Sequence, residues 1–192
     1  MLDPQSPTWS RELGQHYLRL SRGRSQKESR RLATQSLAKL ERATELDDGV
    51  NARFYALGDL AKTAFLAGKL ETATAYAEEL LELADKTPRD WNTGNAVHHG
   101  NLVLGRIALA NGDVEEAKTC LLKTGKTSGS PQLNSFGPNM AMAKELLERG
   151  ERDVVLEYFE LCRKFWPRKE LDRWNAAVQA GEVPNFGGNL FY

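Results

Sequence analysis

The adjacent histidines His98 and His99 are the first residues to weigh for chemistry, because a neutral imidazole can bind metal ions or transfer protons. They lie in the run NAVHHGNLVLGRIALA (95–110), which has the periodicity of a helix. Neighbouring residues on a helix point about 100° apart, and neither histidine has a Cys or His at ligand spacing. We therefore expect no metal site and no cofactor.

Other catalytic patterns are weak. The string TGKTSGS (124–130) is similar to the end of a phosphate-binding loop. That motif needs a glycine where Cys120 stands and a strand before it, and the sequence offers neither. Paired carboxylates such as Glu115 and Glu116 fall on helix faces expected in solvent, and no nucleophile elbow or dinucleotide fingerprint occurs. We expect a protein that is not an enzyme, while a catalytic site assembled in three dimensions stays open.

Composition indicates a globular chain of 192 residues without net charge, since Lys+Arg and Asp+Glu both total 26. Cys120 and Cys162 lack metal-type spacing and are expected as reduced core thiols, which suits a cytoplasmic protein. The first residues lack the basic start and apolar run of a signal peptide. No apolar stretch approaches the ~18–20 residues that span a bilayer. The sequence therefore predicts a cytoplasmic protein of one domain, with no membrane partner.

A basic run, RLSRGRSQKESRR (19–31), carries six cations against the single acid Glu28. Such a run forms either a nucleic-acid or phosphate patch, or the solvated start of a helix. The neutral balance of the chain and the lack of interleaved aromatic residues favour the solvated helix. We therefore do not expect nucleic acid as a partner.

Helical patterns cover nearly the whole chain. Residues 25–46 place apolar and small side chains on one stripe with a 3.6-residue period. Ser6 or Thr8 is expected to cap the first helix, and Asp113, with Glu116 three residues on, forms a capping box. No segment has the alternation of a strand. The sequence predicts the all-α class.

Three windows repeat one spacing: LAKTAFLAGKLETA (60–73), LGRIALANGDVEEA (104–117) and MAKELLERGERDVV (142–155). When they are aligned on their glycines, each has a small residue seven before the glycine. Apolar residues also stand three and four before it and five after it. The aligned sets are Gly68, Gly112 and Gly150; Ala61, Gly105 and Ala143; Ala64, Ala108 and Leu146; Phe65, Leu109 and Leu147; Ala73, Ala117 and Val155. The repetition predicts a helical hairpin used three times, with glycine closing each turn.

This pattern resembles the tetratricopeptide repeat over roughly residues 50–166. The glycines lie 44 and 38 residues apart, which exceeds the family's period of about 34. The consensus tryptophan and tyrosine of the first helix are missing, and Pro88 and Pro167 are displaced from the usual closing position. An unrelated helical bundle with chance glycines is the alternative. The segment SPQLNSFGPNMAMAKELLERGERDVVLEYFELCRKFW (130–166) is also similar to bacterial tetratricopeptide-like proteins without an assigned activity.

The resemblance implies a short right-handed α-solenoid of antiparallel helix hairpins. We expect one domain, 1–192, with N-terminal capping helices in 1–48, three repeat-like pairs in 50–166, and a capping helix and tail in 167–192. In the tail, Phe186, Leu190, Phe191 and Tyr192 are expected to fold back around Trp174, because a solenoid must cover its terminal apolar face.

The segment TSGSPQLNSFGPNM (127–140) interrupts the helices with turn residues around two apolar side chains. We expect it to be ordered, with Leu133 and Phe136 buried against the neighbouring helices. The alternative is a functional loop that presents Asn134, Ser135 and Asn139 at one end of a groove. These readings stay open.

Each repeat-like unit has a cation six residues before its glycine: Lys62, Arg106 and Lys144. In the resembled family this position lines the concave groove, so the resemblance implies a basic ladder that grips an acidic peptide or a free C-terminus. Tyr55 and His99, seven residues before Lys62 and Arg106, are expected on the same face. The function expected is a protein- or peptide-binding module, a scaffold. The alternative is a small ligand-binding regulator or enzyme with its site under residues 127–140.

Overall fold

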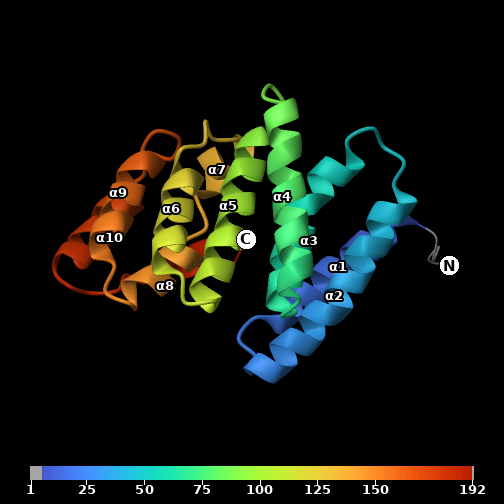
Figure 1. Ribbon diagram of the computed structural model, residues 1–192, viewed down its shortest axis with the longest axis horizontal. Helices are drawn as coiled ribbons and strands as arrows, with labels where there is room; N and C mark the ends of the chain where they lie inside the picture. Colours follow the sequence, from blue (N-terminus) through green and yellow to red (C-terminus); the bar gives the residue numbers. More distant parts are fainter. Residues whose placement is uncertain (1–5, 192) are drawn as a thin grey trace. The chain divides into compact units, whose positions relative to one another are not determined.

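The computed structural model describes residues 6–191, and every regular element in that range is helical (Figure 1). The described residues contain no strand, so the predicted all-α class is confirmed. None of the helices in this range combines the length and apolar character needed to span a bilayer.

The chain forms two compact units, residues 1–83 and residues 84–192. The first unit contains α1 (Pro7–Ser21), α2 (Gln26–Leu46), α3 (Ala52–Leu66) and most of α4 (Leu70–Lys86). The second contains α5 (Thr93–Ala110), α6 (Val114–Gly125), α7 (Pro131–Phe136), α8 (Ala141–Leu147), α9 (Arg152–Cys162), α10 (Lys169–Gln179) and a 3-10 turn, Gly187–Leu190. The expected helix pairs correspond to α3–α4, α5–α6 and α8–α9. Their grouping into one domain stays a prediction.

Local capping chemistry sets the helix starts of the first unit. The Ser6 hydroxyl accepts the N–H of Trp9 at the start of α1, and Ser25 accepts the N–H of Glu28 at the start of α2. Of the two expected caps, Ser6 is therefore the one used. The helix α2 then buries the whole stripe predicted from its period, which consists of Leu32, Ser36, Leu37, Leu40 and Ala43, and it also buries Ala33.

The three hairpins close with the same turn. In each, the residue after the glycine donates its N–H to the carbonyl four residues before the glycine. This pattern is a Schellman motif, in which glycine takes the left-handed conformation. The φ angles of Gly68, Gly112 and Gly150 are 77°, 85° and 88°. The bonds are Lys69 to Ala64 (3.0 Å), Asp113 to Ala108 (2.9 Å) and Glu151 to Leu146 (3.1 Å). The predicted glycine turns are confirmed.

Equivalent positions of the hairpins are buried alike. The small residues seven before the glycine are all buried, as are the residues five after it, Ala73, Ala117 and Val155. At Gly105 the reason is visible, because a Cβ there would lie 2.2 Å from Met142 Sδ and 2.8 Å from Cys120 Cβ. The lack of a side chain at Gly105 lets α5 lie directly against α6 and α8.

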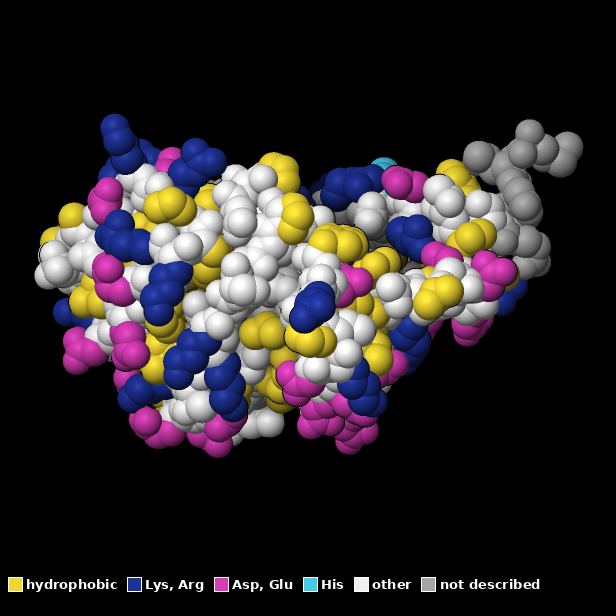
Figure 2. All heavy atoms as spheres, turned by 90° about the horizontal axis from the view of Figure 1, so that it is seen from above, with side chains coloured by type: hydrophobic (Ala, Val, Ile, Leu, Met, Phe, Trp, Pro, Cys, Tyr) yellow, Lys and Arg dark blue, Asp and Glu magenta, His cyan; other side chains and the backbone are white. Residues whose placement is uncertain are grey.

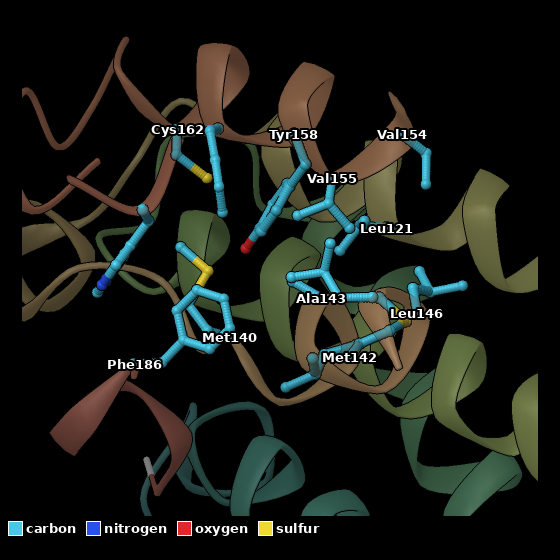
Figure 3. Close-up of a cluster of buried hydrophobic side chains, with 14 of the residues drawn as sticks. Leu121, Met140, Met142, Ala143, Leu146, Val154, Val155, Tyr158, Cys162 and Phe186 are labelled. Atoms are coloured by element: carbon cyan, nitrogen blue, oxygen red, sulfur yellow. The ribbon is translucent and has the colours of Figure 1, made fainter. Parts of the chain in front are cut away.

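The core of the second unit lies between α6, α8 and α9 (Figure 3). Leu121, Ala143, Leu146, Val155 and Tyr158 are among its fully buried side chains. The two cysteines, both free and buried, belong to the same cluster. The expectation of two unpaired core thiols is confirmed.

The tail covers the last helices of this unit. The ring of Phe186 contacts Trp174 of α10 and Phe159 of α9, with centroid distances of 5.0 and 6.3 Å. The expected fold-back is thus confirmed for Phe186, and Leu190 is partly buried. Phe191 is instead half exposed, and Tyr192 lies outside the described residues.

Candidate functional site

The three predicted groove cations all lie close to the C-terminal end of their helices, and each forms an ion pair. Lys62 pairs with Asp59 (3.1 Å), Arg106 with Glu145 (2.6 Å) and Lys144 with Glu148 (3.2 Å). On the face shown in Figure 2, basic and acidic side chains are likewise interspersed. The candidate site is therefore a set of ion pairs and not a row of bare positive charges.

The pair formed by Arg106 and Glu145 joins two helices. Arg106 Nε and Nη2 lie 3.0 and 2.6 Å from Glu145 Oε1, which makes a fork-like contact between α5 and α8. The side chains are only 22% and 29% exposed. Such a charge-assisted contact is stronger than an ordinary surface pair, so Arg106 has a structural role in addition to any role in binding.

Within the second unit, the ion pair of Arg106 is formed with the residue that follows Lys144 in the chain. Lys144 is the neighbour of Glu145 on α8, and its side chain is 43% exposed, about twice the value for Arg106. His99 lies two turns from Arg106 on α5 and is half-buried. Lys62 and the exposed Tyr55 belong to α3 of the first unit. A continuous ladder through all three hairpins stays a prediction.

The loop segment 127–140 is ordered around a short helix, α7. Ser130 caps this helix by accepting the N–H of Leu133, and Pro131 takes the first helical position, where its missing N–H costs nothing. Leu133 is 2% exposed, as expected. Phe136 is 66% exposed, so the prediction that it is buried is wrong. The helix ends at Phe136, and Gly137 (φ 85°) turns the chain over the ring of Trp166.

A polar network fixes this loop to the first turn of α5. Asn95 Nδ2 donates to Gln132 Oε1 (3.0 Å), and the Ser130 hydroxyl donates to Asn95 Oδ1 (2.5 Å). The Thr127 hydroxyl donates to the carbonyl of Gly94 (3.0 Å). A Cβ at Gly94 would lie 1.8 Å from the carbonyl oxygen of Gly129, so only glycine permits this contact. The network uses its polar groups internally, which favours a structural role.

His98 anchors the other end of the loop. It is fully buried, and its Nε2 accepts the N–H of Asn139 at 3.0 Å. The ring proton therefore lies on Nδ1, which faces the carbonyl of Thr124 at 3.4 Å. The two histidine rings are edge-on to each other, and no group of three potential metal ligands occurs among residues 6–191.

The three loop residues proposed for presentation differ in their surroundings. Asn134 and Ser135 are exposed. Asn139 is 5% exposed, and its Oδ1 accepts the N–H of Ala141 (2.8 Å) at the start of α8. The alternative, in which the loop presents these residues, is therefore wrong for Asn139. Its side chain orders the chain between α7 and α8 because it satisfies an otherwise orphaned N–H.

Both thiols are protected from ionisation. Burial raises the pKa of Cys120 to about 12, and a hydrogen bond to Glu116 adds to the rise. Burial also raises the pKa of Cys162. Because the thiolate is the nucleophilic form, neither cysteine is poised to act as a nucleophile.

Sequence reasoning missed a fourth glycine turn and the short helix in the loop. Gly181 has φ 86°, and Glu182 donates its N–H to the carbonyl of Ala177 at 2.9 Å, as in the three hairpins. The spacing of apolar residues before Gly181 could have predicted this turn. The start of α7 could have been predicted from the Ser-Pro pair at 130–131.

Comparison with known proteins adds no family. No protein-family model matches this chain. A comparison with curated proteins gives no match either.

Proposed function

We propose that the chain is a short right-handed α-solenoid, similar in design to tetratricopeptide arrays, which binds a protein or peptide partner. The observation that supports this most directly is the shared glycine turn of α3–α4, α5–α6 and α8–α9, together with the matching burial at equivalent positions. Repeated hairpins place equivalent residues of their first helices along one surface, and such surfaces bind extended partners. The buried free thiols suit a reducing, cytoplasmic setting.

The chemistry of that surface favours a carboxylate as the anchoring group of the partner. Lys62, Arg106 and Lys144 stand at equivalent positions, but each already contacts an acid. An incoming carboxylate must therefore replace a resident one. The replacement costs least at Lys144, because its pair with Glu148 is an exposed i,i+4 pair, worth about 0.3–0.5 kcal/mol.

A peptide selection tests the proposal. A library of random peptides with free C-termini is selected against the full chain, and enriched peptides are titrated by calorimetry. Lys144→Gln should weaken binding, whereas Glu148→Gln should strengthen it, because that change removes the competing carboxylate. Lys164→Gln, an exposed change elsewhere in the second unit, is the matched control.

Two results would contradict the proposal. One is that no peptide is enriched over an unrelated helical protein. The other is that enriched peptides bind the Lys144 and Glu148 variants as they bind the unchanged chain.

A further inference from the structure

One end of the first unit gathers seven basic residues from two turns. Six of them lie in residues 19–31, at the turn between α1 and α2. The structure adds Lys69, because the turn between α3 and α4 lies at the same end of this unit (Figure 1). The turn between α3 and α4 lies close to α2, because a Cβ at Gly68 would lie 3.0 Å from Arg30 Nε. The basic end therefore comprises Arg19, Arg22, Arg24, Lys27, Arg30, Arg31 and Lys69.

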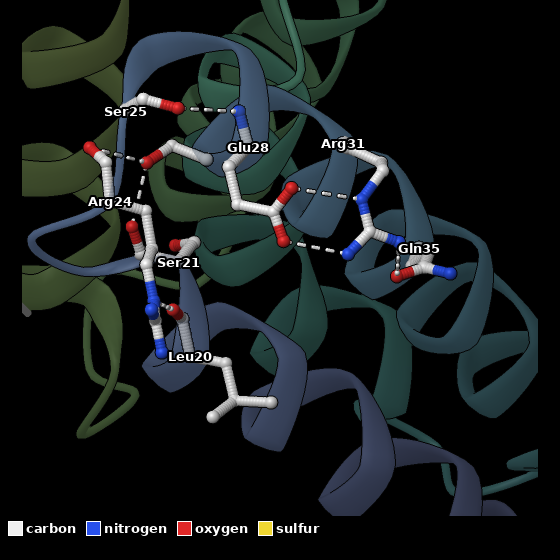
Figure 4. A network of polar contacts seen from close by, with 8 residues as sticks. Leu20, Ser21, Arg24, Ser25, Glu28, Arg31 and Gln35 are labelled. Atoms are coloured by element: carbon white, nitrogen blue, oxygen red, sulfur yellow. Dashed lines mark hydrogen bonds and ion pairs between the residues drawn. The ribbon is translucent and has the colours of Figure 1, made fainter.

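These seven side chains face solvent and form a band. All are exposed. On α2, Lys27, Arg30 and Arg31 fall within an arc of about 100°, given 3.6 residues per turn. Arg30 lies toward Gly68, and Arg31 donates to the Glu28 carboxylate from Nη2 (2.7 Å) and Nε (3.2 Å, Figure 4). The band thus runs from the end of α1, across the start of α2, to the start of α4.

This placement opposes helix stability. The N-terminus of a helix carries partial positive charge, which favours acids in the first turns and disfavours cations. The start of α2 nevertheless has Lys27 in its first turn, beside Glu28, and Arg30 and Arg31 in the turn that follows, where the effect is weaker. The ion pair with Glu28 offsets the charge of Arg31. Lys27 is thus the first-turn cation that breaks this local rule, and such a break is typical of a functional surface. The same partial charge adds to the attraction for an anion.

The balance of charge at this end differs from that of the whole chain. Seven cations stand against Glu28 and the nearby Glu71, a local excess of five in a chain with net charge 0. We infer that the basic end binds the phosphate backbone of double-stranded nucleic acid, without sequence preference. This surface is distinct from the hairpin face, and the inference does not rest on the proposed peptide binding.

The chemistry of the band distinguishes the partner. Five of the seven cations are arginine, whose planar guanidinium matches phosphate with two hydrogen bonds. Residues 19–31 and 66–70 contain no aromatic side chain for stacking on unpaired bases. An interfacial membrane helix would need an apolar face free for lipid, but the apolar stripe of α2 is buried in the unit.

Fluorescence anisotropy with the full chain and a labelled 20-base-pair DNA of random sequence provides the test. Each phosphate contact contributes about −0.9 to the slope of log K against log salt. The exposed pair Arg19 and Lys27 is replaced in the double variant Arg19→Gln/Lys27→Gln. Its slope should be smaller in magnitude by about 1.8, for two lost contacts, and its affinity at low salt should be at least about tenfold weaker.

The matched control is Lys126→Gln/Lys164→Gln, which removes the same charge from exposed positions of the second unit. It should leave the slope unchanged, with helix content verified by circular dichroism for all variants. If both double variants lost affinity for the duplex equally, the effect would come from net charge alone, and the inference would be overturned. It would also be overturned by tighter binding to poly-glutamate or to anionic phospholipid vesicles than to the duplex, or by no binding to the duplex at 50 mM salt.

Discussion

The ring of His98 and the backbone N–H of Asn139 are 41 residues apart in the chain but form a hydrogen bond of 3.0 Å. The bond ties the chain before α8 to the first half of α5. His98→Leu removes the acceptor and leaves a buried N–H unsatisfied, which costs about 1–3 kcal/mol. We expect the free energy of unfolding, measured in urea, to fall by that amount. Hydrogen exchange at the amide of Asn139 should become faster.

The control for His98 is His16→Leu at an exposed position of α1, which should change stability by no more than about 0.5 kcal/mol. Nitrogen chemical shifts of the His98 ring should report a proton on Nδ1. A proton on Nε2 would contradict the assigned direction of the bond.

The two apolar residues of the loop should respond differently to truncation. Leu133 is 2% exposed, so Leu133→Ala should destabilise the protein by about 2–5 kcal/mol. Phe136 is 66% exposed, and Phe136→Ala should change the free energy of unfolding by no more than about 0.5 kcal/mol. Thermal or urea unfolding measures both. Similar losses for the two variants would mean that the ring of Phe136 is packed in solution.

Adding one methyl group at Gly105 should disturb the second unit. The new Cβ would meet Met142 Sδ and Cys120 Cβ at 2.2 and 2.8 Å, and overpacking of this kind costs about 1–3 kcal/mol. Gly188→Ala is the control, because nothing lies within 4 Å of its Cβ position. Chemical denaturation measures the free energy of unfolding of both variants. Equal values for the two would contradict the close approach of α5 and α8.

Alkaline pH should act on the first unit through Tyr76. Burial raises the pKa of Tyr76 to about 12, and the hydrogen bond of its hydroxyl to Glu41 (2.9 Å) adds to the rise. An unfolded tyrosine has a pKa of about 10. The folded state therefore holds this proton more tightly. The resulting stability is complete below about pH 10 and disappears as the pH rises toward about 12.

The measurement for Tyr76 is the difference in unfolding free energy between the unchanged chain and Tyr76→Phe, recorded from pH 9 upward. This difference should decrease between about pH 10 and about pH 12. A difference independent of pH would show that the phenol titrates alike in both states.

Local features of the fold could be predicted from sequence because their causes are local. Glycine at a turn and Asp113 as a cap need only neighbouring residues, and Asp113 Oδ1 does accept the N–H of Glu116 at 3.0 Å. The ion pairs of Lys62 and Lys144 also join residues three and four apart. Such pairs follow from helical geometry alone.

The long-range part of the candidate site could not be predicted in this way. The partner of Arg106 is 39 residues away, and the buried state of Asn139 depends on His98 and on the start of α8. Phe136 carries the same apolar signal as Leu133, but only Leu133 meets the second unit's interior. These outcomes depend on which segments pack together, and a one-dimensional pattern does not contain that information.

The left-handed turns have a consequence for chemical synthesis of the protein. At Gly68, Gly112, Gly150 and Gly181 the backbone occupies the region that natural amino acids avoid, but their mirror images prefer it. D-alanine at these four positions matches the existing conformation and restricts the unfolded chain, a change worth roughly 0.4–1 kcal/mol at a compatible site. A synthetic chain with D-alanine at these four positions should therefore be more stable than the natural all-L chain.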